Sequence, residues 1–583
     1  MKRCPTCNRV ENDDALVFCR VDGATLINAS SSLGSEMGTA RLHSGSMVAE
    51  IETNLLPNIT NAGINRSTGP TTVLPNQAFG PTSQLKPGSR KRLTTIVVVA
   101  TAAIAASTAF FVNSYLLKKS EKTIQSIAVM PFVNDSGNVD VEYLSDGMTE
   151  TLIGSLSQLP NVSVKARSSV FRYKGKETNA QTIGKELNVQ SILNGRVVQR
   201  GDELAVTLEL VDAQTENVIW SGRYNRKQAD LVTLQSEIAR DVSSKLRTKL
   251  SGADEAKVTK TYTANPQAYQ LYLKGRFYDA KRTKEDLLRS IELFEQAARL
   301  DPNFALAYVG IANSSGHMTG YGYAAPNEVF PKAIAALRQA LHIDPELAEG
   351  HASYADILAE YDWNWSEAER EFKRSLELNP NVAQTHYQYG TSCLIPQGRF
   401  DEAIIELKRG LELEPLSVHM TANVAGLYAN ARKYDLAMEH AREAVRLEPG
   451  HPTARFWIGF VSAANGMYDE AISVCEPTLR SDPTNQDCLQ VVGYAYAKAG
   501  RRREAEEVIR KFDEIGKTQY SVMYRAAVIY ALLADKEKSF ATLEKAFAAH
   551  DWDLNRINVD PFVDSLRDDP RFKDLTKRMG LTR

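Results

Sequence analysis

The sequence has no surplus of charge of either sign. Its 69 lysine and arginine residues are balanced by 71 aspartate and glutamate residues, which gives a formal net charge of −2 over 583 residues. Proteins that bind nucleic acid or acidic polymers through charge carry a strong basic surplus. The balance therefore gives no reason to expect nucleic acid as a partner.

Cysteine is scarce and unevenly placed. Three of the six cysteines lie within the first 19 residues, and the others are Cys393, Cys475 and Cys488. This distribution does not fit a disulfide framework. Cys475 and Cys488 could meet in an oxidising compartment, but we expect free buried thiols.

The sequence also lacks the motifs of common enzymes. It contains no phosphate-binding G-x-x-x-x-G-K-[ST] loop, no kinase signature set, no H-E-x-x-H and no G-x-S-x-G. Its nine histidines are scattered, and His317, His342 and His351 do not stand at ligand spacing from carboxylates. We therefore expect a protein that is not an enzyme and has no catalytic residues.

The first 28 residues predict a small metal site. Cys4 and Cys7 form a C-x2-C pair, and Cys19 and Asp22 form a C-x2-D pair. Thiolates two residues apart can bind one Zn²⁺, and an Asp oxygen can be a fourth ligand. The stretch resembles bacterial zinc-ribbon modules with a CPxC…FCxxDG pattern, although a full ribbon has a fourth cysteine in place of Asp22. The alternative for Asp22 is that it only shapes a turn.

A linker and a hydrophobic run follow. Residues 29–92 are rich in Ser, Thr, Gly, Asn and Pro without a helical or strand period, which predicts a disordered linker. Residues 93–117 contain no charge and are bracketed by Arg90–Arg92 and Lys118–Lys119. This run predicts a single transmembrane helix. The basic residues slightly favour a cytoplasmic N-terminus, and thiolate zinc sites suit a reducing compartment.

Residues 124–250 read as an α/β domain. Strands are expected at 126–132, 162–166, 191–199, 203–212 and 218–224, and helices at 141–159, 180–187 and 230–250. The alternation of LAVTLELVD predicts a sheet with one buried face.

This stretch resembles the TolB-like N-terminal domain of many bacterial signalling proteins. The matching blocks are Ile127–Phe132, Tyr143–Gly147, Leu156–Leu159, Ala166–Phe171 and Asn194–Val197. The resemblance implies an accessory or sensory domain without established chemistry, often joined to tetratricopeptide repeats. Three residues are weak candidates for ligand contact. Asp146 is equally explained by a turn, Arg167 by a solvated loop and Trp220 by a core position.

The C-terminal half is punctuated by proline at a nearly constant interval. An acidic or amide residue precedes Pro302, Pro345, Pro380, Pro415, Pro449 and Pro483, at spacings of 43, 35, 35, 34 and 34 residues. A second series keeps the same period, with Ala368, Ala403, Ala437, Ala471, Ala505 and Ser539. Since proline ends a helix, two series in phase predict stacked helix pairs. The pattern resembles the tetratricopeptide repeat.

About eight repeat units are expected over residues 265–549. The second unit is longer, and Gly316–Phe330 is interpreted as an insertion in its helix turn. Residues 550–583 resemble the ending of many bacterial repeat proteins and are expected to form a capping helix.

Five aromatic residues are candidates for a peptide groove. They are Tyr387, Phe456, Phe460, Tyr494 and Tyr524, at positions that line the concave face in tetratricopeptide proteins. They could form an apolar trough for a helix or an extended peptide. The alternative is that some of them pack between helices or against other segments of the chain.

The combined prediction is multidomain: zinc ribbon, single transmembrane helix, α/β TolB-like domain and all-α repeat solenoid. We expect an inner-membrane interaction scaffold for signalling or envelope assembly, with the N-terminus cytoplasmic and the C-terminal domains periplasmic. Its partner would be a protein or peptide, and Zn²⁺ its only cofactor. Alternatives are a regulatory subunit of a separately encoded enzyme, such as a nucleotide cyclase, and a small-molecule or glycan sensor.

Overall fold

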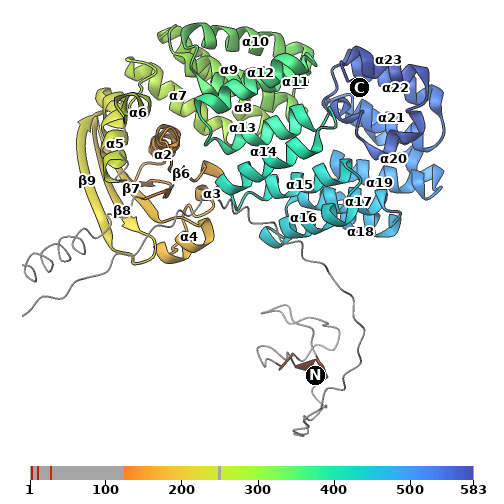
Figure 1. Ribbon diagram of the computed structural model, residues 1–583, viewed down its shortest axis with the longest axis horizontal. Helices are drawn as coiled ribbons and strands as arrows, with labels where there is room; N and C mark the ends of the chain where they lie inside the picture. The colour runs from red at the N-terminus through yellow and green to blue at the C-terminus, as the bar shows by residue number, and fades with distance from the viewer. Residues whose placement is uncertain are drawn as a thin grey trace, which may run out of the picture. The chain divides into compact units, whose positions relative to one another are not determined.

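The computed structural model describes part of the chain (Figure 1). The described residues are Lys2–Arg3, Val10–Glu11, Ile27–Asn28, 124–246, 251–520 and 522–581. The chain divides into two units, residues 1–102 and 103–583, which are treated separately. Within the described residues, no helix combines the length and the apolar character needed to cross a membrane.

The first unit contains three two-residue strands. They are β1 (Lys2–Arg3), β2 (Val10–Glu11) and β3 (Ile27–Asn28), paired antiparallel in the order β2-β1-β3. The predicted zinc ligands Cys4, Cys7, Cys19 and Asp22 lie outside the described residues. So do the predicted linker 29–92 and the predicted membrane span 93–117.

The described residues of the second unit begin with a mixed sheet. Its strands are β4 (Ser126–Val129), β5 (Val133–Asn134), β6 (Ser163–Val164), β7 (Ser191–Arg200), β8 (Glu203–Asp212) and β9 (Val218–Lys227). The strand order is β6-β4-β7-β8-β9, with β5 also paired to β7. Strands β4 and β5 run parallel to β7, whereas β7, β8 and β9 form an antiparallel meander.

The alternation along β8 explains why one face of this sheet is buried. Leu204, Val206, Leu208 and Leu210 are at most 1% exposed, while the residues between them face outward. Helices α2 (Glu142–Ser157) and α5 (Leu231–Lys245) contribute to the same core. The other helices of this α/β domain are α3 (Arg167–Phe171), α4 (Ala180–Leu187) and α6 (Gly252–Val258).

Eight helix pairs follow within the described residues. They are α7 (Pro266–Asp279) with α8 (Lys284–Leu300), α9 (Ala305–Gly320) with α10 (Pro326–Ile343), α11 (Ala348–Glu360) with α12 (Trp365–Leu378), α13 (Ala383–Gln388) and the π-helical η3 (Tyr389–Leu394) with α14 (Phe400–Leu413), α15 (Val418–Asn430) with α16 (Tyr434–Leu447), α17 (Pro452–Ala464) with α18 (Tyr468–Ser481), α19 (Gln486–Lys498) with α20 (Arg502–Ile515), and α21 (Met523–Leu532) with α22 (Lys536–Ala548).

The periodic small residues sit where the two helices of a pair approach each other. All six are 0% exposed: Ala368, Ala403, Ala437, Ala471, Ala505 and Ser539. Larger side chains at these positions would hold the helices apart. The series read from the sequence therefore marks the closest packing within each pair.

Two histidines join the helices of their pairs in the same way. His351 Nδ1 lies 2.6 Å from Glu371 Oε2, and His386 Nδ1 lies 2.6 Å from Glu406 Oε2. Each partner lies 20 positions away in sequence, on the other helix of the pair, so the contact joins the two helices.

The second helix pair of the array, α9 with α10, differs from its predicted form. Residues of the supposed turn insertion extend α9 to Gly320 and start α10 at Pro326, so only a short turn separates the helices. Because α9 and α10 take up both ends of the supposed insertion, the extra length of this pair lies mainly in these two helices.

The α/β domain packs against the repeats at two places. Its hydrophobic core continues into the first pair, through residues such as Leu273 and Phe294. Elsewhere it contacts the proline-marked loops that close the third and fourth pairs. There Asn379 Nδ2 donates to Ser157 Oγ over 3.0 Å, and Lys165 Nζ donates to the carbonyl of Glu412 over 3.1 Å.

The last described residues do not form a ninth pair. They fold into two 3-10 helices, η4 (Trp552–Arg556) and η5 (Pro561–Leu566), and helix α23 (Pro570–Arg578). This segment, residues 550–581, is called the C-terminal segment below. In Figure 1 its helix lies beside α22, near α11.

A matched pair of glycine substitutions tests the packing between neighbouring pairs. A Cβ on Gly426 would lie 2.3 Å from the buried ring of Trp457, whereas a Cβ on Gly316 would meet no atom within 4 Å. Gly426→Ala should lower the free energy of unfolding by about 1–3 kcal/mol because the ring has to move. Gly316→Ala should raise it by up to about 1 kcal/mol, since alanine favours the helix. Urea unfolding followed by circular dichroism measures both, and equal effects would contradict the packing.

Candidate binding surface of the repeats

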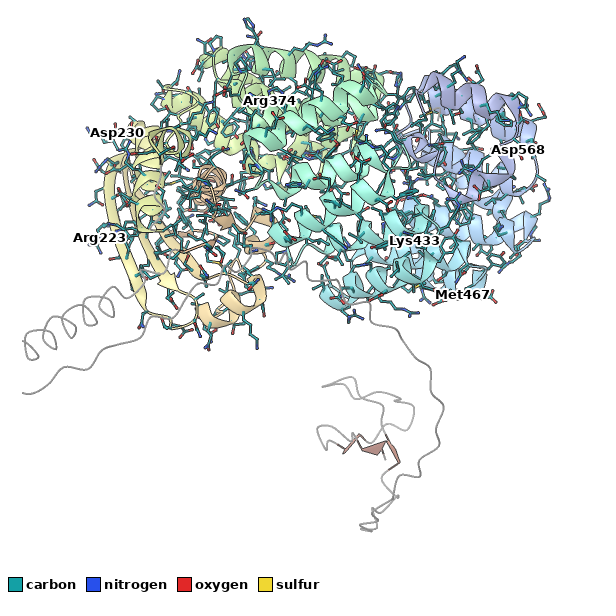
Figure 2. All side chains as sticks on the ribbon, in the orientation of Figure 1. Arg223, Asp230, Arg374, Lys433, Met467 and Asp568 are labelled. Atoms are coloured by element: carbon teal, nitrogen blue, oxygen red, sulfur yellow. The ribbon has the colours of Figure 1, made fainter. Side chains whose placement is uncertain are left out.

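The first helices of consecutive pairs pack against one another along the array. Such contacts join α9 to α11, α15 to α17, α17 to α19, and α19 to α21. The first helices therefore form one continuous layer, called the inner face below. Side chains such as Arg374 and Lys433 lie on other parts of the surface (Figure 2).

One part of the inner face is polar. Ser353 Oγ donates to Asn313 Oδ1 over 2.7 Å, and Gln388 Nε2 donates to Asp356 Oδ2 over 2.7 Å. Tyr387 Oη and His419 Nε2 are hydrogen-bonded over 3.0 Å. Together these side chains form a ladder between successive helices, called the polar strip: Asn313, Ser353, Asp356, Tyr387, Gln388, His419. All of them retain some exposure to solvent.

Two carboxylates one helical turn apart stand in this region without a basic partner that the structure describes. Burial raises the pKa of Asp356 to about 6, and the hydrogen bond from Gln388 only partly opposes this rise. Burial also raises the pKa of Glu360, and the neighbouring Asp356 raises it further. Ser392 Oγ donates to Glu360 Oε1 over 3.1 Å. Within the described residues, Asp356 Oδ1 is buried without a hydrogen-bond partner.

The predicted aromatic residues divide into two groups. Tyr387 lies in the polar strip and is partly exposed. Phe456, Phe460, Tyr494 and Tyr524 are 6%, 2%, 1% and 0% exposed, so they line no open trough in this structure. Of the two alternatives that the sequence left, packing against the chain's own segments describes these four residues.

Phe562 of the C-terminal segment covers the centre of this aromatic group. Its ring centroid lies 5.0 Å from that of Phe460 in an edge-to-face arrangement, and 4.7 Å from that of Tyr494. Phe562 itself is only 4% exposed. Edge-to-face and tilted ring pairs add stabilisation beyond the area that they bury.

A buried polar network surrounds these rings. Tyr524 Oη donates to Asp560 Oδ2 over 2.9 Å, and Arg525 Nε donates to Asp553 Oδ2 over 2.5 Å. Burial raises the pKa of Asp560. Within the described residues, Gln490 Oε1 is fully buried and lacks a hydrogen-bond partner. The aromatic part of the inner face is thus closed by charged as well as apolar groups of the C-terminal segment.

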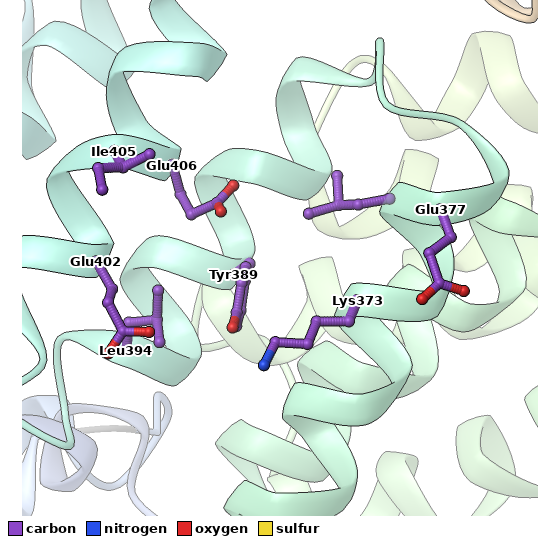
Figure 3. Close-up of a pocket in the computed structure, with 8 residues that line it drawn as sticks. Lys373, Glu377, Tyr389, Leu394, Glu402, Ile405 and Glu406 are labelled. Carbon is purple, nitrogen blue, oxygen red and sulfur yellow. The ribbon is translucent and has the colours of Figure 1, made fainter. Parts of the chain in front are cut away.

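A surface hollow in the described residues lies on a different face. It has a volume of about 490 Å³ and lies between α12, α14 and η3 (Figure 3). Its lining combines apolar Leu376, Leu394 and Ile405 with Lys373 and three glutamates. Ile405 is 66% exposed, which describes a shallow surface depression rather than an enclosed ligand cavity.

The weak candidates in the α/β domain have structural partners. Asp146 is buried and accepts a hydrogen bond from Lys174 Nζ over 2.5 Å. Arg167 stacks over the ring of Phe171 at 3.9 Å from the centroid, and Trp220 lies in strand β9. No group of three or more His, Cys, Asp or Glu side chains arranged for a metal ion occurs in the part of the chain that the structure describes.

Comparison with known families matches two parts of the chain. Residues 425–485 match a tetratricopeptide repeat model, and residues 122–241 match a model described as the second domain of HilA/YgeH-like transcriptional regulators. The first match identifies the helix pairs within residues 425–485 as tetratricopeptide repeats, and the other described pairs have the same helix-turn-helix arrangement. The TolB-like resemblance of residues 124–250 stays a prediction.

A curated relative and several solved structures are similar to parts of this repeat protein. Putative adenylate cyclase 3 of Rhizobium meliloti (strain 1021) is 28% identical over 236 residues, or 40% of each chain, so the match spans two fifths of that relative's length. PilW, a type IV pilus biogenesis factor, is 19% identical with a TM-score of 0.32, covering 38% of this chain and 98% of its own. Pseudomonas aeruginosa pilF is 20% identical with a TM-score of 0.29, covering 37% and 92%.

Sequence reasoning missed the role of Phe562. Its motif, Asp560-Pro561-Phe562, marks the start of η5, and Asp560 caps that helix by accepting from the Phe562 amide. A helix-stop signal followed by an aromatic residue after the last repeat was the available hint. Nothing in its spacing indicates that the ring reaches α17 and α19.

The raised pKa of Asp356 predicts a pH-dependent effect of one substitution. Between about pH 4 and pH 6 the folded chain keeps a proton that the unfolded chain releases, so the stabilisation present at low pH is lost as pH rises through 6. Asp356→Asn should therefore raise the melting temperature at about pH 7.5 and change it little at about pH 4. Asp513→Asn, on the exposed side of α20, serves as the control and should act alike at both pH values. Differential scanning fluorimetry measures this, and a shift of Asp356→Asn independent of pH would refute the assignment.

Proposed function

We propose that the chain is a membrane-tethered scaffold that binds a protein or peptide through the inner face of its tetratricopeptide repeats. The observation that carries this proposal is the polar strip, a row of partly exposed hydrogen-bonding side chains along successive first helices. Donors and acceptors at such spacing suit the backbone of an extended peptide. The same proposal includes a role of this scaffold in signalling or envelope assembly.

The N-terminal part of the proposal rests on sequence. Cys4, Cys7, Cys19 and Asp22 would hold one Zn²⁺ in the cytoplasm, and residues 93–117 would cross the inner membrane. The α/β domain and the repeats would then lie in the periplasm. The linker 29–92 would let the zinc module move independently.

A second candidate function has one specific observation in its favour. The relative named putative adenylate cyclase 3 shares a region of 236 residues with this chain. We propose as the alternative that the chain is an accessory or regulatory subunit of a separately encoded nucleotide cyclase. The shared region covers 40% of that relative, so the relative's activity is not carried over to this chain.

Substitutions in the polar strip test the scaffold proposal. Tyr387→Ala combined with His419→Ala removes an aromatic ring and a hydrogen-bonding pair from the exposed inner face. Recovery of a bound partner in affinity purification from membranes should fall at least about tenfold, because loss of central contacts typically costs more than 1 kcal/mol. Quantitative mass spectrometry of the recovered proteins measures the effect.

The matched control for this experiment is Arg374→Ala. Arg374 pairs with Glu377 across one turn of α12, the second helix of its pair, whereas the polar strip lies on first helices, so removal of Arg374 should leave recovery unchanged. A partner with a nucleotide cyclase domain would favour the accessory role. Equal recovery with the double variant and the wild type would remove the polar strip as the binding site.

A membrane-impermeant thiol reagent tests the zinc and topology proposals together. Cys393, Cys475 and Cys488 are buried free thiols, as expected from the sequence, and buried thiols react slowly. In intact spheroplasts we expect no labelling, because Cys4, Cys7 and Cys19 would face the cytoplasm. After lysis, labelling should require a chelator, since zinc-bound thiolates are protected. Labelling of intact spheroplasts would reverse the topology, and labelling after lysis without chelator would exclude the metal.

A further inference from the structure

The C-terminal segment contacts the repeats as a bound chain would, rather than as another repeat. Its residues reach the third, fourth and fifth helix pairs, which precede it by well over a hundred positions. Side-chain donors of the repeats bind its main chain at two points. Trp365 Nε1 donates to the carbonyl of Met579 over 2.7 Å, and Arg432 Nη1 donates to the carbonyl of Val559 over 2.9 Å.

Side chains of the segment complete this set of contacts. Asn555 Oδ1 accepts from Trp363 Nε1 over 2.7 Å, and Asn558 Nδ2 donates to the carbonyl of Pro396 over 3.1 Å. Bonds between side chains of one element and the main chain of another are how grooves recognise irregular peptides. By contrast, neighbouring repeats contact one another through regular helix packing.

The segment also inserts one aromatic anchor. Phe562 lies against Phe460 and Tyr494, on two consecutive first helices of the array. If the segment moved away, both rings would be left on the inner face beside the polar network. The covered surface therefore has the composition of a peptide-binding site: aromatic rings in the centre and polar groups at the edge.

The charges around Phe562 indicate which chemistry the surface accepts. Arg432 Nη2 pairs with Asp564 Oδ1 over 2.7 Å, and Arg525 pairs with Asp553. Two arginines of the repeats thus bind two aspartates that flank the aromatic anchor in sequence. Arginine binds carboxylates in a defined geometry, so acidic residues on either side of an aromatic residue are selected here.

Several of these contacts are of kinds that contribute little net stability. Arg432 and Asp564 are 38% and 51% exposed, and exposed ion pairs are typically worth below about 1 kcal/mol. Buried ion pairs such as Arg525–Asp553 recover little more than their cost of desolvation. The segment also buries apolar side chains such as Leu554, Val563 and Leu566 in the core of the repeats, and its tether gives it a high effective concentration.

From these contacts we infer that the C-terminal segment is an exchangeable intramolecular ligand of the aromatic part of the inner face. A partner that binds this part displaces it and carries an aromatic residue flanked by acidic residues. That the segment occupies the inner face rests on these contacts alone. That the displacing partner is a protein rests on the proposed function. The segment then regulates access to the repeats.

A labelled synthetic peptide of residues 550–581, added to the full chain in detergent, tests the exchange. The release variant combines Phe562→Ala with Asn558→Ala, which removes the anchor and one hydrogen bond. Fluorescence anisotropy should show at least about tenfold tighter binding of the peptide to the release variant than to the wild type, because the site is vacated. A peptide with Phe562→Ala should bind neither protein. The control chain variant, Phe171→Ala in α3, should behave as wild type.

Hydrogen exchange shows whether the array survives in the release variant. Amides of residues 550–581 should exchange faster than in the wild type, while those of α17 and α19 keep their protection. Loss of protection throughout the repeats would overturn the inference, because the segment would then be a structural cap. Equal peptide affinity for both proteins would overturn it as well. If the release variant forms dimers and the peptide dissociates them, the inner face binds a second copy of the chain, and the intramolecular binding is overturned.

Affinity purification with the same variants separates this inference from the proposed function. Regulation predicts that the release variant recovers several-fold more partner than the wild type. Equal recovery, with peptide exchange intact, would overturn the regulation and leave the scaffold function standing. Absence of any partner from both proteins, with exchange intact, would refute the proposed function and leave the occupancy of the inner face by the segment established.

Discussion

The close approach of the two helices within each pair is the constraint on which the repeat array depends. At one position per pair, a residue no larger than serine is fully buried between the helices, as Ala437 and Ser539 show. Each pair has an apolar surface that is buried only when the next pair covers it. The helices of a pair are therefore fixed by small residues, and the pairs are held together by their neighbours.

The two non-repeating parts of the second unit pack against the two ends of the array, and both extend beyond the end that they contact. The α/β domain shares a core with the first pair and also binds the loops of the third and fourth pairs through Asn379 and Glu412. The C-terminal segment completes the last pair and binds Trp363 and Arg432. Together with the bond from Asn327 Nδ2 to the carbonyl of Ala548, these contacts join pairs that are far apart in sequence.

The sequence predicted those features that follow from a local period. Alternation located β8 at 203–212 with its apolar face inward, and the 34-residue series located the helix pairs and their small residues. Prediction failed where contacts depend on residues far apart in sequence. The tetratricopeptide resemblance assigned Phe460 and Tyr494 to the concave face, but it carries no information about Phe562, which lies 102 and 68 positions later. The pairing of His351 with Glu371 was missed for the same reason.

The inner face therefore offers two surfaces of different chemistry to a partner. The polar strip around Tyr387 and Asp356 is accessible in the present conformation, and its carboxylates have only neutral partners in the described structure. The aromatic part is covered by a segment whose aspartates meet arginines of the repeats. A partner with hydrogen-bonding groups alone can use the first surface directly. A partner with an aromatic residue and flanking acidic groups has to compete with the chain itself, so its affinity is lowered by the free energy of displacing the C-terminal segment.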